Sequence, residues 1–204
     1  MRKKSFKVIL VSFLLLLIST SYVFADYSSV HVYLGTIRTS GNDLEYYKDS
    51  SIASYGYTSH VDNAVSQWSS ASGGVDITST NDEDCECIAV YAGRYILGSG
   101  TYASTGYYDN GFFGWNHLDA DDVHEGDNFD RARIRIDDGN MDDAGFTAPN
   151  ANKTIGHEFG HALGLGHFED SPSHSGDHWM KSGQISLSAP TSTDKDHLKN
   201  KWGN

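Results

Sequence analysis

The most informative feature of the chain is one short segment, residues 157–167, with the sequence HEFGHALGLGH. Side chains four residues apart share a helix face, so His157 and His161 can direct two imidazole nitrogens at one tetrahedral zinc ion. Glu158 is rotated by roughly 100° of helix from His157, which brings its carboxylate within reach of a zinc-bound water. The segment therefore predicts a catalytic zinc site with Glu158 as the general base.

The end of this segment predicts a turn that returns the chain to the metal. Gly164 has no Cβ and adopts positive φ readily, so it can end the helix and reverse the chain. His167 then becomes the third ligand. The motif has five fixed positions, which are His157, Glu158, His161, Gly164 and His167. All five should occur together by chance in under ~1 chain of this size in 10,000, whereas His-Glu-x-x-His alone should occur in ~1 in 40. The alternative, an amphipathic helix with solvated or core histidines, is therefore disfavoured.

At these residues the sequence resembles the metzincin clan of zinc endopeptidases, and most closely its matrixin branch. The resemblance implies a methionine turn beneath the metal, and Met180 is the only methionine that follows His167. An ordinary core methionine is the alternative for Met180. The resemblance also implies a metzincin-like α+β fold. Its expected parts are a twisted, mixed five-stranded sheet with an antiparallel edge strand, and three helices, including the zinc-binding active-site helix and a C-terminal helix.

The activity implied by the resemblance is hydrolysis of proteins or peptides by a monomeric, zinc-dependent endopeptidase. Three neutral imidazoles leave a fourth zinc position for water, whose pKa falls to about 7, so Glu158 can remove its proton. Two alternatives remain open. A zinc hydrolase of a non-peptide amide or ester would use the same ligands, whereas a non-enzymatic calcium-binding surface module would leave Glu158 without a role.

The first 25 residues have the composition of a secretory signal peptide. Four basic residues precede an apolar stretch at residues 8–18, and small residues favour cleavage after Ala25. This stretch is shorter than the ~20 residues that a membrane-spanning helix requires. Residues 26–204 are long enough to form one catalytic domain with a hydrophobic core. We therefore expect a secreted protein with no membrane partner.

The chain is strongly acidic. Its formal net charge is −12, and removal of the signal peptide, which holds four basic and no acidic residues, changes it to −16. This charge disfavours nucleic-acid binding. Acidic loops could supply oxygen ligands to a structural calcium ion, and a solvated acidic surface has equal weight. The candidate ligands are Asp119, Asp121, Asp122, Asp127, Asp130, Asp137, Asp138, Asp142 and Asp143.

Other potential metal ligands lie outside the motif. Residues 126–130 are similar to a glycine- and aspartate-containing stretch of matrixins but lack its histidine, which argues against a second, structural zinc. His117 and His124 could still bind one, although surface histidines are usually solvated. His174 and His178 lie between His167 and Met180 and could compete for metal, with a polar loop as the alternative.

Cys85 and Cys87 are separated by a single residue. They are either free thiols or one local disulfide, and they lack partner cysteines for a metal site. We therefore leave them out of the predicted site.

The elements before the motif follow a β-α-β order. An apolar, β-branched and aromatic run at residues 30–34 predicts a first strand. Apolar residues recur at helical spacing over residues 58–69, where Thr58 or Ser59 can cap the helix. Residues 75–77 and 88–91 predict two more short strands. This order favours parallel pairing.

The region that precedes the motif should supply the substrate-binding edge. Residues 98–115 are crowded with glycine and aromatic residues, which predicts an irregular loop and then a short exposed strand near residues 112–115. The resemblance implies that an extended peptide lies antiparallel to a strand here. Residues 131–136 alternate charged and apolar side chains, which predicts a half-buried strand.

Two helices are predicted after this strand. The active-site helix should run over residues 151–163, with Ile155 and Phe159 toward the core. Thr193 with Asp196 resembles a capping box, so we expect a closing C-terminal helix to begin there.

Overall fold

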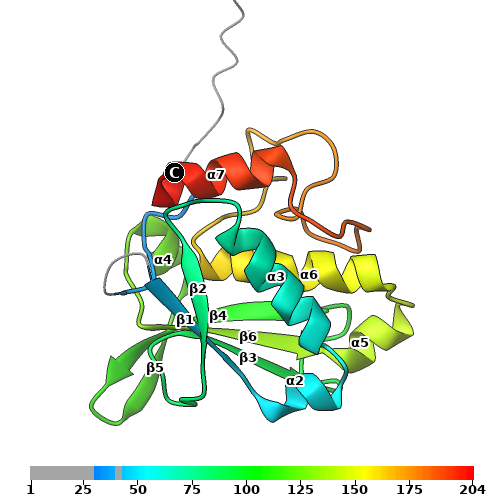
Figure 1. Cartoon of the computed structure of the whole chain (residues 1–204), viewed down its shortest axis with the longest axis horizontal. Helices are drawn as coiled ribbons and strands as arrows, with labels where there is room; N and C mark the ends of the chain where they lie inside the picture. Colours follow the sequence, from blue (N-terminus) through cyan, green and yellow to red (C-terminus); the bar gives the residue numbers. More distant parts are fainter. Residues whose placement is uncertain (1–29, 40–42) are drawn as a thin grey trace, which may run out of the picture.

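A mixed sheet of six strands forms one layer of the molecule, and the longer helices lie over one side of it (Figure 1). The computed structural model describes residues 30–39 and 43–204, so the predicted signal peptide lies outside the described residues. The strand order is β2-β1-β3-β6-β4-β5, with parallel pairing from β2 to β6 and antiparallel pairing of β4 with both of its neighbours. The strands are β1 (Asp43–Lys48), β2 (Asp76–Thr80), β3 (Ile88–Gly93), β4 (Ala103–Gly111), β5 (Gly114–Leu118) and β6 (Arg131–Asp137).

Six helices accompany the sheet in the described part of the chain. They are α2 (Ser50–Ser54), α3 (Thr58–Ser69), α4 (Ala120–Glu125), α5 (Asp138–Asp143), α6 (Ala148–Ala162) and α7 (Ser192–Trp202). The predicted α+β class with a mixed sheet is confirmed, whereas the expected five strands and three helices are wrong. The additional helices α2, α4 and α5 are each a single turn or two, begun by the N-capping carboxylates of Asp49, Asp119 and Asp137.

The predicted first strand at residues 30–34 is wrong. Val32 forms only an isolated bridge with Leu165, outside the sheet. The first strand is instead β1, whose sequence DLEYYK has few aliphatic residues, so it gave no strand signal. Residues 30–34 lie against the chain that follows α6, where Tyr33 N donates to the carbonyl of Gly164 at 2.9 Å.

Helix positions follow the predictions, with differences at the ends. The bounds of α3 are as predicted, but Tyr57 is its N-cap and no side chain caps it. Helix α6, which the sequence predicts as the active-site helix, begins three residues earlier than predicted, because Thr147 and Asn150 form a reciprocal capping box. A second capping box, of Thr191 with Asp194, starts α7 two residues before the predicted pair.

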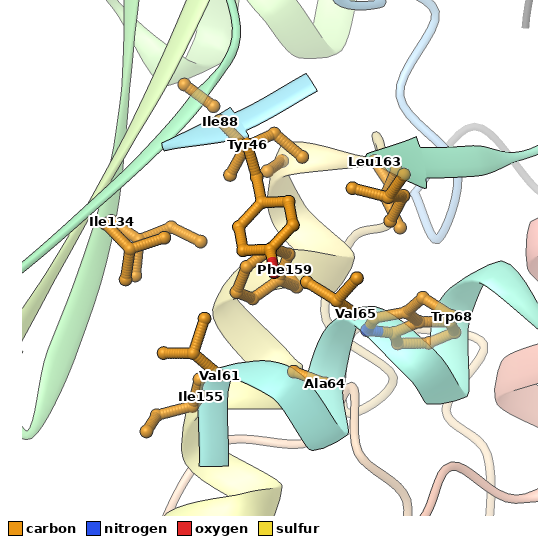
Figure 2. Close-up of a cluster of buried hydrophobic side chains, with 14 of the residues drawn as sticks. Tyr46, Val61, Ala64, Val65, Trp68, Ile88, Ile134, Ile155, Phe159 and Leu163 are labelled. Atoms are coloured by element: carbon orange, nitrogen blue, oxygen red, sulfur yellow. The ribbon is translucent and has the colours of Figure 1, made fainter. Parts of the chain in front are cut away.

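Helices α3 and α6 pack together on one side of the sheet and enclose the main core (Figures 1 and 2). Ile155 and Phe159 of α6 are fully buried there, as predicted. The indole Nε1 of Trp68 in α3 donates to the carbonyl of Gly156 in α6 at 2.8 Å. A Cβ on Gly156 would overlap the ring of Trp179, so only glycine allows this close packing. These contacts fix the position of the helix that carries the motif.

Residues 98–118 are more regular than predicted. Most of them form the β4-β5 hairpin, and the exposed Phe112 and Phe113 occupy its turn. The hairpin is antiparallel, and β5 pairs only with residues 107–111 of β4. Residues 103–106 of β4 therefore pair with β6 on one side and with none of the described strands on the other.

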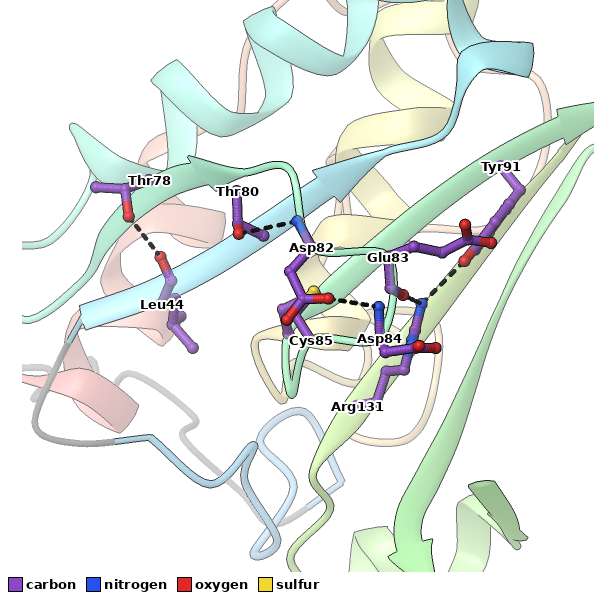
Figure 3. The surroundings of a disulfide bond; sticks show 10 residues. Leu44, Thr78, Thr80, Asp82, Glu83, Asp84, Cys85, Tyr91 and Arg131 are labelled. Carbon is purple, nitrogen blue, oxygen red and sulfur yellow. Dashed lines mark hydrogen bonds between the residues drawn. A yellow bond between two sulfur atoms is a disulfide. The ribbon is translucent and has the colours of Figure 1, made fainter. Parts of the chain in front are cut away.

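Cys85 and Cys87 are joined in a disulfide immediately before β3 (Figure 3). Next to it, the guanidinium of Arg131 donates to the carbonyl of Glu83 at 2.7 Å and to the hydroxyl of Tyr91 at 2.9 Å. The bond thus closes the turn between β2 and β3, which resolves the two alternatives for these cysteines. None of the helices within residues 30–39 and 43–204 is both long and apolar enough to cross a membrane.

Candidate metal centre

The three histidines of the motif converge on one point. Helix α6 carries His157 and His161 on one face, and their Nε2 atoms are 2.9 Å apart. His167, beyond the helix end, brings its Nε2 to 3.1 Å from Nε2 of His161. Two nitrogens bound to one tetrahedral zinc ion at its usual bond lengths would be about 3.3 Å apart. The predicted ligand set is therefore gathered at distances that suit a metal ion.

Hydrogen bonds to main-chain carbonyls orient two of these rings. His157 donates from Nδ1 to the carbonyl of Trp179 at 2.8 Å, and His161 donates from Nδ1 to the carbonyl of Leu165 at 2.8 Å. A carbonyl oxygen only accepts, so both Nδ1 atoms carry the proton and both Nε2 atoms hold a lone pair. Two lone pairs that face each other at 2.9 Å repel unless a cation lies between them. A hydrogen bond from the other ring nitrogen to a carbonyl oxygen is typical of metal-bound histidines.

The protonation of the site also suits metal binding. Burial, followed by the nearby imidazole of His161, holds the pKa of His157 well below its usual value. Burial and the nearby His167 lower the pKa of His161 to about 3. Both rings are therefore neutral at pH 7, which is the state that ligates a metal.

Glu158 lies beside the three histidines in the same cleft, where it is 6% exposed. Burial raises its pKa to about 7, while the hydroxyl of Thr105 and the charge of Lys153 oppose this change. The Thr105 hydroxyl is 2.7 Å from Oε2 of Glu158 and 3.0 Å from the Glu158 carbonyl oxygen, and it has one proton to donate. Thr105 thus fixes the orientation of the Glu158 carboxylate, whose pKa is raised.

Replacement of Thr105 by valine is expected to lower kcat/KM for a hydrolysed substrate by about tenfold, because Glu158 loses one hydrogen bond to its carboxylate. Steady-state kinetics of the purified variant would measure this. Thr105→Ser should restore the wild-type rate, because it keeps the hydroxyl. Ser104→Ala is a matched control, since the neighbouring Ser104 hydroxyl has no hydrogen-bond partner among the described residues. Equal rates for Thr105→Val and wild type would show that this hydrogen bond is not needed.

The predicted turn after the helix is present at Gly164. Its φ is +84°, in the left-handed region, and the next hydrogen bond runs from Leu165 N to the carbonyl of Gly160 at 2.9 Å. A Cβ at this position would overlap the side chain of Lys201. Lys201 Nζ donates to the carbonyls of Tyr33 and Gly35 at 2.7 and 2.9 Å. The turn therefore joins α6, α7 and the N-terminal segment.

Replacement of Gly164 by alanine is expected to lower the melting temperature by about 4 °C and to weaken metal binding. The left-handed conformation costs an L-residue roughly 1–2 kcal/mol, and the new methyl group displaces Lys201. Thermal unfolding with and without metal would measure both effects. Gly56→Ala is the matched control, because Gly56 has φ +81° and open space around it. If the two variants lose equal stability and bind metal equally well, the turn has no specific role.

Met180, the residue predicted for a methionine turn, packs against the helix that carries the motif. It is fully buried, and a Cβ on Gly160 would overlap its Sδ atom, so the thioether lies against α6 one residue before His161. The preceding Trp179 supplies the carbonyl that orients His157. The carboxylate of Asp194 accepts from the backbone N–H groups of Trp179 and Met180, each at 3.1 Å. Helix α7 therefore holds this turn against the motif histidines.

The centre opens into a cleft of about 560 Å³. Residues 100–105 line one wall, so the unpaired edge of β4 borders the cleft. Lys153 also lines the cleft, where it is buried and donates to the carbonyls of Lys181 and Gly183. Burial lowers the pKa of Lys153 to about 8. The cleft therefore has the edge of β4, Lys153 and Glu158 in its lining.

Comparison with known proteins gives no family assignment. Neither the scan against protein-family models nor the search of curated proteins finds a match to this chain.

The acidic residues suggested for calcium do not gather around a common point. Asp137 accepts from the backbone N–H groups of Tyr95, Leu97 and Asn140 at 2.7–3.0 Å. Asp130 pairs with Arg38, and Asp138 and Asp142 pair with Arg94. In the described residues, groups of three or more potential ligand atoms within 4.8 Å of one another consist of histidines alone. The calcium expectation therefore finds no support there.

The other suggested histidines have separate surroundings. His117 packs edge-on against Tyr108, and His124 lies on the ring of Tyr33 with centroids 3.7 Å apart. His178 contacts the hydroxyl of Thr191 and the carbonyl of Ser175, each at 2.8 Å. None of these three belongs to a cluster of three potential metal ligands in the part of the chain that the structure describes, so the second zinc suggested for His117 and His124 finds no support.

Sequence reasoning missed several side chains around the centre. Tyr33 brings its hydroxyl to 3.1 Å from Nδ1 of His161, from a segment predicted only as a strand. Thr105 lies in the region predicted as a loop, and Lys153 was one more charged residue on the helix. Each acts through a long-range contact, so no local pattern indicates its role.

Proposed function

We propose that the chain is a zinc-dependent endopeptidase, with zinc held by His157, His161 and His167 and with Glu158 as the general base. The observation that carries this proposal is the convergence of three imidazole nitrogens, two of them with lone pairs fixed by carbonyl hydrogen bonds, beside a buried carboxylate. Three neutral nitrogen donors and an adjacent carboxylate are the donor set of hydrolytic zinc sites.

The metal, when bound, would supply a Lewis acid that activates water and polarises the substrate carbonyl. Glu158 takes the proton of the attacking water, for which its raised pKa is well matched at neutral pH. The same carboxyl group then delivers that proton to the leaving amine. Thr105 keeps the carboxylate in one orientation during both transfers. One carboxylate thus accounts for both proton transfers of peptide hydrolysis.

A peptide is the substrate that best fits the cleft. Residues 103–106 of β4 have backbone groups on their unpaired side, and an extended peptide can pair with such a strand edge. Backbone pairing of this kind would give most of the affinity for the peptide. A peptide bound this way would lie next to Glu158, because the carboxylate of Glu158 accepts a hydrogen bond from Thr105 of β4.

Membership of the metzincin clan, in a matrixin-like branch, is part of the proposal. It is supported by the turn at Gly164 and by the buried Met180 against α6. We also propose that the protein is secreted as a monomer. The Cys85–Cys87 disulfide is consistent with export, because disulfides persist in oxidising compartments.

The proposal is tested by digestion of casein and of a peptide library, with and without a zinc chelator. We expect cleavage that the chelator abolishes and added zinc restores. Assays with simple esters and non-peptide amides run in parallel. Hydrolysis of those compounds without any peptide cleavage would replace the endopeptidase with another zinc hydrolase, and chelator-resistant cleavage would remove zinc from the mechanism.

A further inference from the structure

A second cluster of three histidines lies outside the motif. His31 comes from the segment before β1, His174 from the loop after His167, and His197 from α7. One ring nitrogen from each lies within 4.8 Å of the other two. His31 and His197 are 0% and 1% exposed, and His174 is partly buried. The cluster is therefore an interior feature that reaches the surface at one ring.

Main-chain carbonyls fix the lone pairs of two of these rings. The carbonyl of Asp170 accepts from Nε2 of His31 at 3.1 Å, and the carbonyl of Thr193 accepts from Nδ1 of His197 at 2.8 Å. These nitrogens carry the protons, so lone pairs remain on His31 Nδ1 and His197 Nε2. His31 Nδ1 is fully buried and has no hydrogen-bond partner among the described residues. A buried acceptor without a donor points to a missing ligand.

The spacing within the cluster also suits a metal ion. Nε2 of His174 is 3.3 Å from Nε2 of His197, close to the separation of about 3.3 Å expected for two nitrogens on a tetrahedral zinc. The motif histidines provide an internal comparison, because they have similar Nε2 separations and the same support from carbonyls. Two clusters built in the same way are expected to bind the same kind of ion.

We propose that His31, His174 and His197 bind a second zinc ion, which stabilises the structure. Imidazole donors suit zinc, and partly exposed His174 leaves room for water as a fourth ligand. The cluster holds no carboxylate, so it lacks a counterpart of Glu158 for hydrolysis. This site does not depend on the proposed peptidase activity.

The second site would hold in place the loop that carries the third catalytic ligand. The rings of His31, His174 and His197 surround Phe168, with centroid separations of 5.4, 4.9 and 4.6 Å. Phe168 directly follows His167, and Gly166 N donates to the carbonyl of His31 at 2.8 Å. A metal ion here would join the N-terminal segment, this loop and α7. Such a link across distant parts of the chain stabilises the folded state.

Zinc stoichiometry tests the inference. The full-length protein is loaded with excess zinc, freed of unbound metal by gel filtration and analysed by mass spectrometry for zinc per chain. We expect two zinc ions for wild type and for the control His117→Ala, whose ring belongs to neither cluster. His174→Ala and His167→Ala should each bind one, and the double variant none. His174 is the partly exposed member, so its removal disturbs the buried packing less than removal of His31 or His197 would.

Thermal unfolding of His167→Ala gives a second readout, because only the second site remains in that variant. Zinc should raise its melting temperature by about 10 °C over the chelated protein, and the double variant should lose this shift. One zinc in both wild type and His174→Ala, or no zinc and no shift in His167→Ala, would overturn the second site. One zinc in wild type and His167→Ala but none in His174→Ala would support the second site and defeat the catalytic one.

Discussion

Replacement of Glu158 by glutamine is expected to lower kcat/KM for peptide cleavage by roughly three powers of ten. Glutamine has the same shape and can still accept the hydrogen bond of the Thr105 hydroxyl, but it cannot take a proton from water. The loss should appear in kcat, because proton transfer belongs to the chemical step. Initial rates with a fluorogenic peptide would measure it over the range of substrate concentrations that separates kcat from KM.

The zinc content of the Glu158→Gln protein is the necessary control. The three histidines keep their positions, and His157 and His161 keep their carbonyl partners, so the variant should bind as much zinc as wild type. Its melting temperature should not fall, because the substitution removes a buried charge and keeps the volume. A variant with full zinc content and a rate within tenfold of wild type would rule out Glu158 as the base.

The sequence predicts the motif well because its geometry is mostly local. Helix periodicity places His157 and His161 on one face, and the glycine at position 164 has the conformation that the turn requires. Helix α3 and strand β6 also follow from their hydrophobic patterns over several turns or residues. The features that can be predicted from the sequence are therefore those set by local spacing or by a long periodic pattern.

Other parts depend on contacts between distant residues. Strand β1 has a mixed polar and aromatic sequence, and its position in the sheet is fixed by pairing with β2 and β3. The residues of the second histidine cluster, His31, His174 and His197, come from three separate segments, so no spacing in the sequence relates them. Local propensity does not determine such pairings, and only the folded chain brings them together.

The acidic region illustrates a different limit. Its aspartates suggested calcium by their number, but a carboxylate that caps a helix and one that binds a cation have the same local sequence. Asp119 and Asp137 cap α4 and α5, and Asp130 pairs with Arg38. The number of aspartates therefore indicated that oxygen ligands for calcium were available. It could not show whether these aspartates bind an ion, cap a helix or pair with an arginine.

Replacement of His167 by alanine is expected to abolish detectable peptide cleavage, a loss of more than about three powers of ten. His167 is the motif ligand best suited to this test. The His167 ring is partly exposed and lies beyond the end of α6. His157 and His161 are buried, and they donate hydrogen bonds to the main-chain carbonyls of Trp179 and Leu165. Loss of the His167 ring should therefore remove a metal ligand without removing a hydrogen bond that orients the other two.

Zinc addition distinguishes a lost ligand from a damaged fold. Wild-type protein treated with a chelator should regain its activity when zinc is restored, because all three nitrogens are still present. The His167→Ala protein should stay inactive in excess zinc, since two neutral imidazoles bind the ion weakly and leave its coordination incomplete. His117→Ala should behave as wild type in both assays. Recovery of full activity by the His167→Ala protein in zinc would show that a different side chain completes the centre.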